Sequence, residues 1–102
     1  MTDKQTEFLA TLETTIRQRL QDRDTSSYTA QLAAAGDKRM AQKVGEEALE
    51  LALAAVAGGR DEQLNEAADL VYHLLVLLNA RGLRLADVSA VLERRHAGRS
   101  SP

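Results

Sequence analysis

The sequence has 102 residues, contains no cysteine and no tryptophan, and is only 3% aromatic. Without cysteine there are no disulfides, no thiolate catalysis and no zinc–cysteine sites. The scarcity of aromatic residues argues against a stacking platform for single-stranded nucleic acid. The one proline, Pro102, is the last residue, so no proline interrupts a helix before it. These absences favour an all-helical body.

The chain also lacks a strong excess of charge and a long apolar segment. Its net charge is −2, so no overall basic field attracts DNA or RNA. The apolar run from Leu74 to Leu78 is far too short to span a bilayer. The first twenty residues mix charged and apolar side chains and lack the apolar region of a signal peptide. We therefore expect a cytoplasmic protein with no nucleic-acid and no membrane partner.

The sequence does have enough apolar residues for one modest core. Hydrophobic residues make up 44% of the chain, mainly Ala, Leu and Val. We expect a single domain over residues 1–102, with its core in residues 5–96 and a flexible tail in 97–102. A core of this size gains from an oligomer. The prediction is an all-α bundle of four to five helices, completed by dimerisation.

Apolar spacing and turn residues divide the chain into five helices. Capping is expected from Ser26 or Ser27, from Asp37 and from Asp61, whereas Gly36, the Gly58-Gly59 pair and Gly82 are expected to end helices. Val88, Val91 and Leu92 are predicted to face inward on the last helix. The expected helices are about 4–22, 28–35, 38–57, 61–80 and 86–96.

The third and fourth helices each carry closely spaced carboxylates. Residues three and four apart share a helix face, so Glu47 and Glu50 form one pair, and Glu66 and Asp69 form another. Two helices joined by a short turn lie antiparallel, which brings the pairs together. Facing carboxylates repel one another unless a cation lies between them. Because the second pair precedes the most apolar segment, and buried charges are paired or metal-bound, we predict a divalent-metal site between the two helices.

Oxygen-only ligands favour Mg²⁺, Mn²⁺ or Ca²⁺ over zinc or copper. The Glu-x-x-His motif of di-iron bundles is absent from these pairs, and His73 does not complete it. We therefore predict Mg²⁺, with Mn²⁺ as the alternative. Such a site beside Lys38, Arg39 and Lys43 suits hydrolysis of a phosphoric anhydride. Lys38 and Arg39 are either contacts to an anionic partner or surface charges of no consequence.

These residues resemble a known family. The pattern Glu46-Glu47-x-x-Glu50 followed by Glu66-x-x-Asp69 resembles the signature of the all-α, MazG-like nucleoside triphosphate pyrophosphatases. Longer strings resemble the phosphoribosyl-ATP pyrophosphatase family within that group, and the resemblance covers about residues 5–96. These strings are K-V-G-E-E from Lys43, E-A-A-D-L-V-Y-H from Glu66, L-L-V-L-L from Leu74, R-G-L from Arg81 and E-R-R-H from Glu93.

The resemblance implies an enzyme that hydrolyses phosphoribosyl-ATP to phosphoribosyl-AMP and pyrophosphate, the second step of histidine biosynthesis. It implies Glu47, Glu50, Glu66 and Asp69 as Mg²⁺ ligands, with Glu46 as a further ligand or as the group that orients the attacking water. Lys38, Arg39, Lys43 and His73 become candidate substrate-binding residues. The resemblance also implies a homodimer and a stand-alone enzyme without the cyclohydrolase domain that some relatives carry.

Two other interpretations remain open at this point. A house-cleaning nucleotide pyrophosphatase of the same fold would use the same carboxylates on dUTP, dCTP or damaged nucleotides. A non-catalytic helical interaction module would present the acidic stripe to a partner and bind no metal. The sequence does not decide which phosphorus is attacked, how many ions bind, or which groups read the base and the second ribose phosphate. Nor does it decide whether Arg81, Arg84, Arg94 and Arg95 reach substrate phosphates or lie in solvent.

Overall fold

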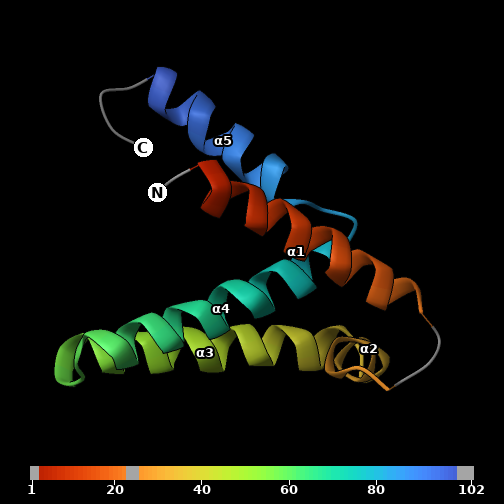
Figure 1. The fold of residues 1–102 in the computed structure, drawn as a ribbon, viewed down its shortest axis with the longest axis horizontal. Coiled ribbons are helices and arrows are strands. Elements are labelled where there is room, and N and C mark those ends of the chain that lie inside the picture. Colours follow the sequence, from red (N-terminus) through yellow and green to blue (C-terminus); the bar gives the residue numbers. More distant parts are fainter. Residues whose placement is uncertain (1–2, 23–25, 99–102) are drawn as a thin grey trace.

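The computed structural model describes residues 3–22 and 26–98. These residues form five α-helices and no strand, which confirms the predicted all-α fold (Figure 1). Most of the predicted tail, residues 99–102, lies outside the described residues. The helices are α1 (Asp3–Gln21), α2 (Tyr28–Ala34), α3 (Asp37–Ala57), α4 (Arg60–Ala80) and α5 (Leu85–Ala97).

Two long helices, α3 and α4, form an antiparallel hairpin (Figure 1). Gly58 and Gly59 join them, as predicted. The backbone at Gly58 folds so tightly that an added Cβ would meet the Glu62 side chain and lie 2.9 Å from the carbonyl oxygen of Ala54. Gln63 Nε2 donates to the Gly58 carbonyl oxygen at 3.2 Å and closes the turn. The two-residue connection therefore aligns α3 with α4 over most of their lengths.

The core lies where α1 and α2 pack against this hairpin. Ile16 of α1, Leu32 of α2, Met40 of α3, and Leu75 and Val76 of α4 form one buried cluster. Burying a side chain of this kind stabilises the fold by roughly 1.5–3 kcal/mol. The cluster lies toward the start of α3 and the end of α4. The end of α3, the start of α4 and the turn between them therefore lie outside this buried cluster.

A buried carboxylate, Glu13, ties α1 to the end of α4 and the start of α5. Its Oε2 accepts hydrogen bonds from Asn79 Nδ2 at 2.9 Å and from the Leu85 backbone N–H at 2.8 Å. The Leu85 N–H belongs to the first turn of α5, where backbone donors lack partners within the helix. Arg17 lies beside the other oxygen of Glu13, at 4.0 Å. Glu13 therefore joins three helices through hydrogen bonds.

Two predicted helix caps are wrong, and one is confirmed. Asp37 and Asp61 lie inside the first turns of α3 and α4, whose cap residues are glycines with no side-chain cap. Asp37 instead accepts from Arg81 at 2.7 Å. Both carboxylates still stabilise their helices, because a negative charge near the N-terminus interacts favourably with the positive end of the helix dipole. Ser27 does cap α2, because its hydroxyl oxygen accepts from the Ala30 backbone N–H at 3.0 Å.

The end of α4 is a glycine cap, as predicted. Gly82 has φ +76°, a left-handed conformation that glycine adopts without steric penalty. The backbone N–H groups of Gly82 and Leu83 donate to the carbonyl oxygens of Asn79 and Leu78, at 3.1 and 2.8 Å. This pattern is a Schellman motif. It turns the chain sharply into α5.

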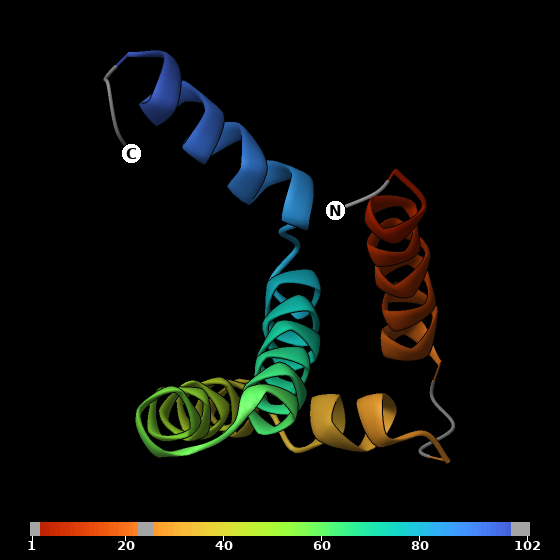
Figure 2. The same ribbon diagram turned by 60° about the vertical axis from the view of Figure 1, so that its left-hand side comes forward.

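The last helix, α5, packs only loosely. None of its residues is buried, and it projects away from the hairpin (Figure 2). Val88 and Val91 are half-buried, but Leu92 is 47% exposed, so the prediction that Leu92 faces inward is wrong. The radius of gyration is 15.0 Å, whereas a compact chain of this length has a radius of gyration of about 13 Å. The chain by itself is thus an open arrangement.

Large apolar side chains are also exposed along α3. Leu49 and Leu53 are each 60% exposed and Val56 is 88% exposed. Among the described residues, no helix combines the length and the apolarity needed to cross a membrane. Leu49, Leu53 and Val56 lie four and three positions apart, so they form one exposed apolar row along α3.

Candidate metal centre

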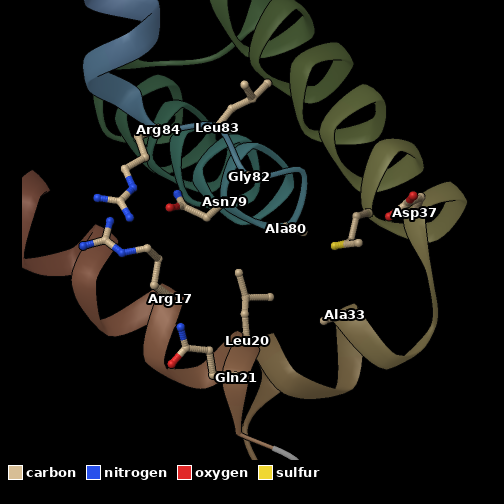
Figure 3. Close-up of a pocket in the computed structure, with 11 residues that line it drawn as sticks. Arg17, Leu20, Gln21, Ala33, Asp37, Asn79, Ala80, Gly82, Leu83 and Arg84 are labelled. Atoms are coloured by element: carbon tan, nitrogen blue, oxygen red, sulfur yellow. The ribbon is translucent and has the colours of Figure 1, made fainter.

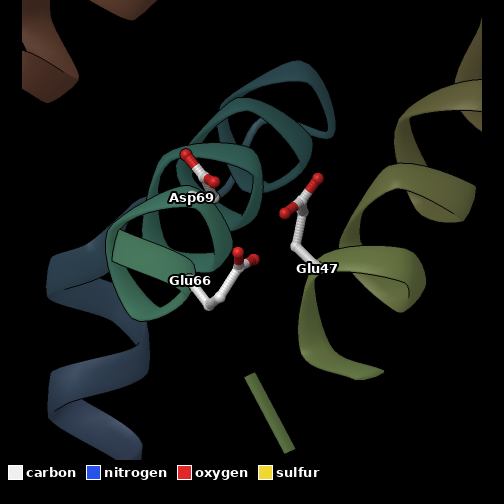
Figure 4. A group of neighbouring side chains, drawn as sticks. All are labelled: Glu47, Glu66 and Asp69. Atoms are coloured by element: carbon white, nitrogen blue, oxygen red, sulfur yellow. The ribbon is translucent and has the colours of Figure 1, made fainter. Parts of the chain in front are cut away.

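Three carboxylates meet between α3 and α4. Glu47 comes from α3, and Glu66 and Asp69 come from α4, and their carboxylates point toward one another (Figure 4). One oxygen from each lies within 4.8 Å of the others. Glu47 is buried, Glu66 is partly buried and Asp69 is exposed. The hairpin therefore brings together the two acidic motifs that the sequence placed on separate helices.

The donors of this cluster fit a hard divalent cation. Glu47 Oε2 and Glu66 Oε2 are both buried and have no hydrogen-bond partner among the described residues. Buried carboxylate oxygens normally have such partners, so two orphans facing one site call for a positive ligand. All the available donors are oxygens, which suits Mg²⁺, Mn²⁺ or Ca²⁺.

The crowding of carboxylates at this site changes the pKa of Glu66. Desolvation of its carboxylate raises the pKa of Glu66, and the contact with Glu50 and the charges of Asp69 and Glu47 raise it further. Glu50 thus interacts with Glu66, but it lies outside the group of three oxygens within 4.8 Å. A proton or a metal ion would relieve the same repulsion.

This pKa shift predicts a pH-dependent stability in the metal-free protein. The folded state binds the Glu66 proton more tightly than the unfolded state does. The stabilisation that this bound proton gives the folded state is therefore complete below the ordinary glutamate pKa and is lost as the pH rises through the raised pKa. We expect urea denaturation in EDTA to show a free energy of unfolding that falls over this range in the wild type. The fall should be smaller in Glu66→Gln, and identical pH profiles would contradict the prediction.

Basic side chains lie on the α3 side of the cluster. Lys43 Nζ lies 3.1 Å from Glu47 Oε1, and this hydrogen bond is the main cause of the raised pKa of Lys43. Glu46 accepts from Gln42 Nε2 at 2.9 Å and lies within 4.0 Å of Lys43 and Arg39, with N···O distances of 3.7 and 3.9 Å. The structure thus places Glu46 among cations and outside the group of three carboxylates.

The remaining predicted site residues are divided between surface and interior. Lys38 and Arg39 are exposed in the first turn of α3. His73 is buried one turn beyond Asp69. Its Nδ1 donates to the Asp69 carbonyl oxygen at 2.7 Å, and its Nε2 lies 2.7 Å from the Tyr28 hydroxyl. His73 therefore contacts the backbone of the acidic motif but does not point a free ring nitrogen at the carboxylates.

Sequence reasoning missed the polar contacts of α2. Tyr28 reaches His73, and the Thr29 hydroxyl hydrogen-bonds the Tyr72 hydroxyl, so two consecutive residues anchor α2 to α4. The only local signal was their place directly after the cap residue Ser27. These are long-range pairs, separated by more than 40 residues, and helical periodicity carries no information on them.

A separate cavity of about 460 Å³ lies beside the start of α3 and the end of α4. Arg17, Arg84 and Asn79 are among the residues that line it (Figure 3). Of the four arginines that the sequence left open, Arg84 lines this cavity, Arg81 pairs with Asp37, and Arg94 and Arg95 are exposed on α5. The cavity contains none of the predicted metal ligands.

Comparison with known proteins identifies the family of this chain. A family model described as phosphoribosyl-ATP pyrophosphohydrolase matches residues 9–96. The chain belongs to the phosphoribosyl-ATP pyrophosphohydrolase family. The match includes both helices that carry the acidic cluster. It confirms the resemblance to this family and the enzyme class that the resemblance implies.

Relatives in this family include separate and fused enzymes. A phosphoribosyl-ATP pyrophosphatase of Pyrobaculum islandicum is 54% identical over 89 residues, which cover 87% of this chain and 95% of the relative. The pyrophosphatase of Pyrobaculum aerophilum is 55% identical over 84 residues, covering 82% of this chain and 89% of the relative. A histidine biosynthesis bifunctional protein HisIE of Xanthomonas campestris pv. campestris is 53% identical over 90 residues, covering 88% of this chain but 44% of that protein.

Proposed function

We propose that this chain hydrolyses phosphoribosyl-ATP to phosphoribosyl-AMP and pyrophosphate in histidine biosynthesis, with Mg²⁺ held between α3 and α4. The observation that carries the metal assignment is the meeting of three carboxylate oxygens within 4.8 Å, two of whose side chains hold orphaned buried oxygens. The names of the relatives, phosphoribosyl-ATP pyrophosphatase and a histidine biosynthesis protein, support the substrate and the pathway. An ATP-derived substrate is consistent with a cytoplasmic enzyme.

The proposed ligands are Glu47, Glu66 and Asp69, joined by Glu50 through its contact with Glu66. A divalent ion bound there would neutralise phosphate oxygens and lower the pKa of a bound water. Mn²⁺ satisfies the same donor set. These carboxylates would hold the ion near the middle of the hairpin, and the exposed side chain of Asp69 leaves one side of the site open to a nucleotide.

The basic residues of α3 are the proposed phosphate contacts. Lys43 is held beside the cluster by Glu47 and Glu46, and Arg39 is held by Glu46. Lys38 projects from the same end of α3. Glu46 acts either as a further ligand or in orienting water, and its contacts add a role in positioning Arg39 and Lys43. His73 would act from behind the site, through the Asp69 backbone and Tyr28.

We also propose a homodimer in which the exposed apolar residues of α3 meet a second copy of the chain. Leu49, Leu53 and Val56 form a row that the described residues leave uncovered, and α5 exposes Leu92. Burying such side chains between copies would supply the core that the open monomer lacks. Multi-angle light scattering should give twice the chain mass, whereas a monomeric mass would contradict the dimer.

The function is tested by pyrophosphate release. We expect Mg²⁺-dependent release from phosphoribosyl-ATP, none in EDTA, and far slower hydrolysis of dUTP, dCTP and ATP at equal concentration. Turnover of the ordinary nucleotides alone would instead support a house-cleaning pyrophosphatase of the same fold. A folded protein with no Mg²⁺ binding in calorimetry and no turnover would support the interaction module.

A further inference from the structure

Tyr28 is a half-exposed aromatic residue held at the edge of the acidic cluster. It is the first residue of α2, and its exposed fraction is 50%. The whole sequence has only two tyrosines, one phenylalanine and no tryptophan. Of the other two aromatic residues, Phe8 of α1 and Tyr72 of α4 line an apolar pocket that also includes Asp69, and the Tyr72 hydroxyl is bonded to Thr29. Tyr28 is the aromatic ring whose hydroxyl is bonded to His73, one turn beyond Asp69.

The hydrogen bonds of His73 determine how Tyr28 is held. A backbone carbonyl oxygen can only accept, so His73 Nδ1 carries the proton that it donates to the Asp69 carbonyl. In the neutral ring, Nε2 is then an acceptor, and the Tyr28 hydroxyl donates to it at 2.7 Å. The two rings meet at 86° with their centroids 5.6 Å apart. The contact uses the hydroxyl-bearing edge of the phenol, so its faces are not stacked on His73.

Tyr28 is also linked to Asp69 and Glu47, two of the three clustered residues, through one intermediate residue each. Through His73 it connects to the backbone of Asp69. On its other side it lies in the neighbourhood of Lys43, which contacts Glu47. The ring is thus linked to the acidic cluster through His73 and lies on the side of the cluster where Lys43 is found.

The chemistry left to Tyr28 is that of a flat apolar surface. Its hydroxyl proton is already donated to His73, so it has no proton for a phosphate oxygen. An exposed aromatic ring in a fixed orientation is a stacking surface for a nucleobase, and stacking does not require hydrogen-bond readout. A nucleotide whose phosphates lie at Lys43 and the carboxylates would bring its base to this side of the site.

We propose that the Tyr28 ring stacks on the purine base of the nucleotide, and that His73 is a positioning residue that holds the ring through its hydroxyl. The proposal rests on the proposed function, because it assumes that the nucleotide phosphates lie at the acidic cluster. Tyr28 would thereby provide the contact to the base, which the two acidic motifs do not provide.

The test separates base contacts from phosphate contacts. The wild type, Tyr28→Phe, Tyr28→Trp and Tyr28→Leu are compared in KM and kcat for phosphoribosyl-ATP and in inhibition by pyrophosphate, which has no base. We expect Tyr28→Leu to raise KM about tenfold, as loss of one stacked base does, and to leave the pyrophosphate inhibition constant within twofold. Tyr28→Trp should stay near wild type, and Tyr28→Phe should raise KM about threefold. Tyr28→Gln replaces Tyr28→Leu if the latter fails to fold by circular dichroism.

Two results would overturn the proposal. Equal changes in KM and in the pyrophosphate constant would mean a general effect on structure, and no change in either would mean no contact. The role of His73 is tested by His73→Gln, which should raise KM in the wild type but add nothing in Tyr28→Phe. A wild type that binds Mg²⁺ but does not turn over phosphoribosyl-ATP would refute the proposed function itself. In that case, unchanged calorimetric binding of AMP to Tyr28→Leu would separately refute the stacking.

Discussion

Replacing Asp69 with Asn is expected to lower kcat/KM for phosphoribosyl-ATP by at least about a thousandfold, equivalent to roughly 4 kcal/mol in the barrier. Asn keeps the size of the side chain but removes one of the three negative charges that converge between α3 and α4. Asp69 is exposed, and its contact with His73 uses the backbone carbonyl, so the substitution leaves the surrounding hydrogen bonds intact. The measurement is pyrophosphate release over a range of Mg²⁺ concentrations, with calorimetric Mg²⁺ binding beside it.

Asp61→Asn is the matched control for this prediction. Asp61 is also an exposed carboxylate of α4, but it lies in the first turn, away from the cluster. It should keep wild-type turnover and wild-type Mg²⁺ affinity. Mg²⁺ should raise the melting temperature of the wild type and of this control but not of Asp69→Asn, because an ion stabilises only a fold that binds it. Asp69→Asn with more than a tenth of wild-type activity would show that Asp69 is not a ligand.

The largest effect on stability is expected from Glu13→Ala, a loss of about 2–3 kcal/mol in the free energy of unfolding. Truncation leaves the Leu85 N–H without a partner and removes one acceptor from the Asn79 amide. Both donors are in partly buried contacts between helices, so water does not fully replace the carboxylate. Urea denaturation measures the loss, and hydrogen exchange should show faster exchange of the Leu85 amide.

Arg17→Ala provides the comparison for Glu13. Arg17 contacts the same carboxylate, but the N···O distance is 4.0 Å and the arginine is partly exposed. Such an ion pair contributes about 0–1 kcal/mol, so the loss should be small. Equal losses in the two variants would mean that the ion pair, and not the hydrogen bonds to α4 and α5, is the important contact.

The hairpin and its carboxylates were predictable from sequence because their signals are local. The spacing of Glu66 and Asp69 and the break at Gly58 and Gly59 depend only on helix geometry and on glycine. The group of Glu47, Glu66 and Asp69 follows once the two helices are antiparallel. Spacing alone does not determine the roll of each helix about its axis, which is why Glu50 lies outside this group although it was paired with Glu47.

Other features depended on contacts between distant residues. The two aspartates expected as caps, Asp37 and Asp61, were misplaced because glycines start α3 and α4, and Asp37 pairs instead with Arg81, 44 residues later. Leu92 was expected to face inward because apolar periodicity identifies an apolar face but not what covers it. The Tyr28–His73 contact had no sequence signal for the same reason.

The two-glycine connection between α3 and α4 also has a consequence for the order of folding. A loop this short loses little entropy on closure, so the hairpin is the long-range structure that can assemble earliest. Closure of this hairpin alone brings Glu47 against Glu66 and Asp69, without any contribution from Ile16 of α1. The repulsion among these carboxylates would then be present in the folding transition state as well as in the native protein. We therefore expect a divalent cation in the medium to accelerate folding, because it would offset this repulsion.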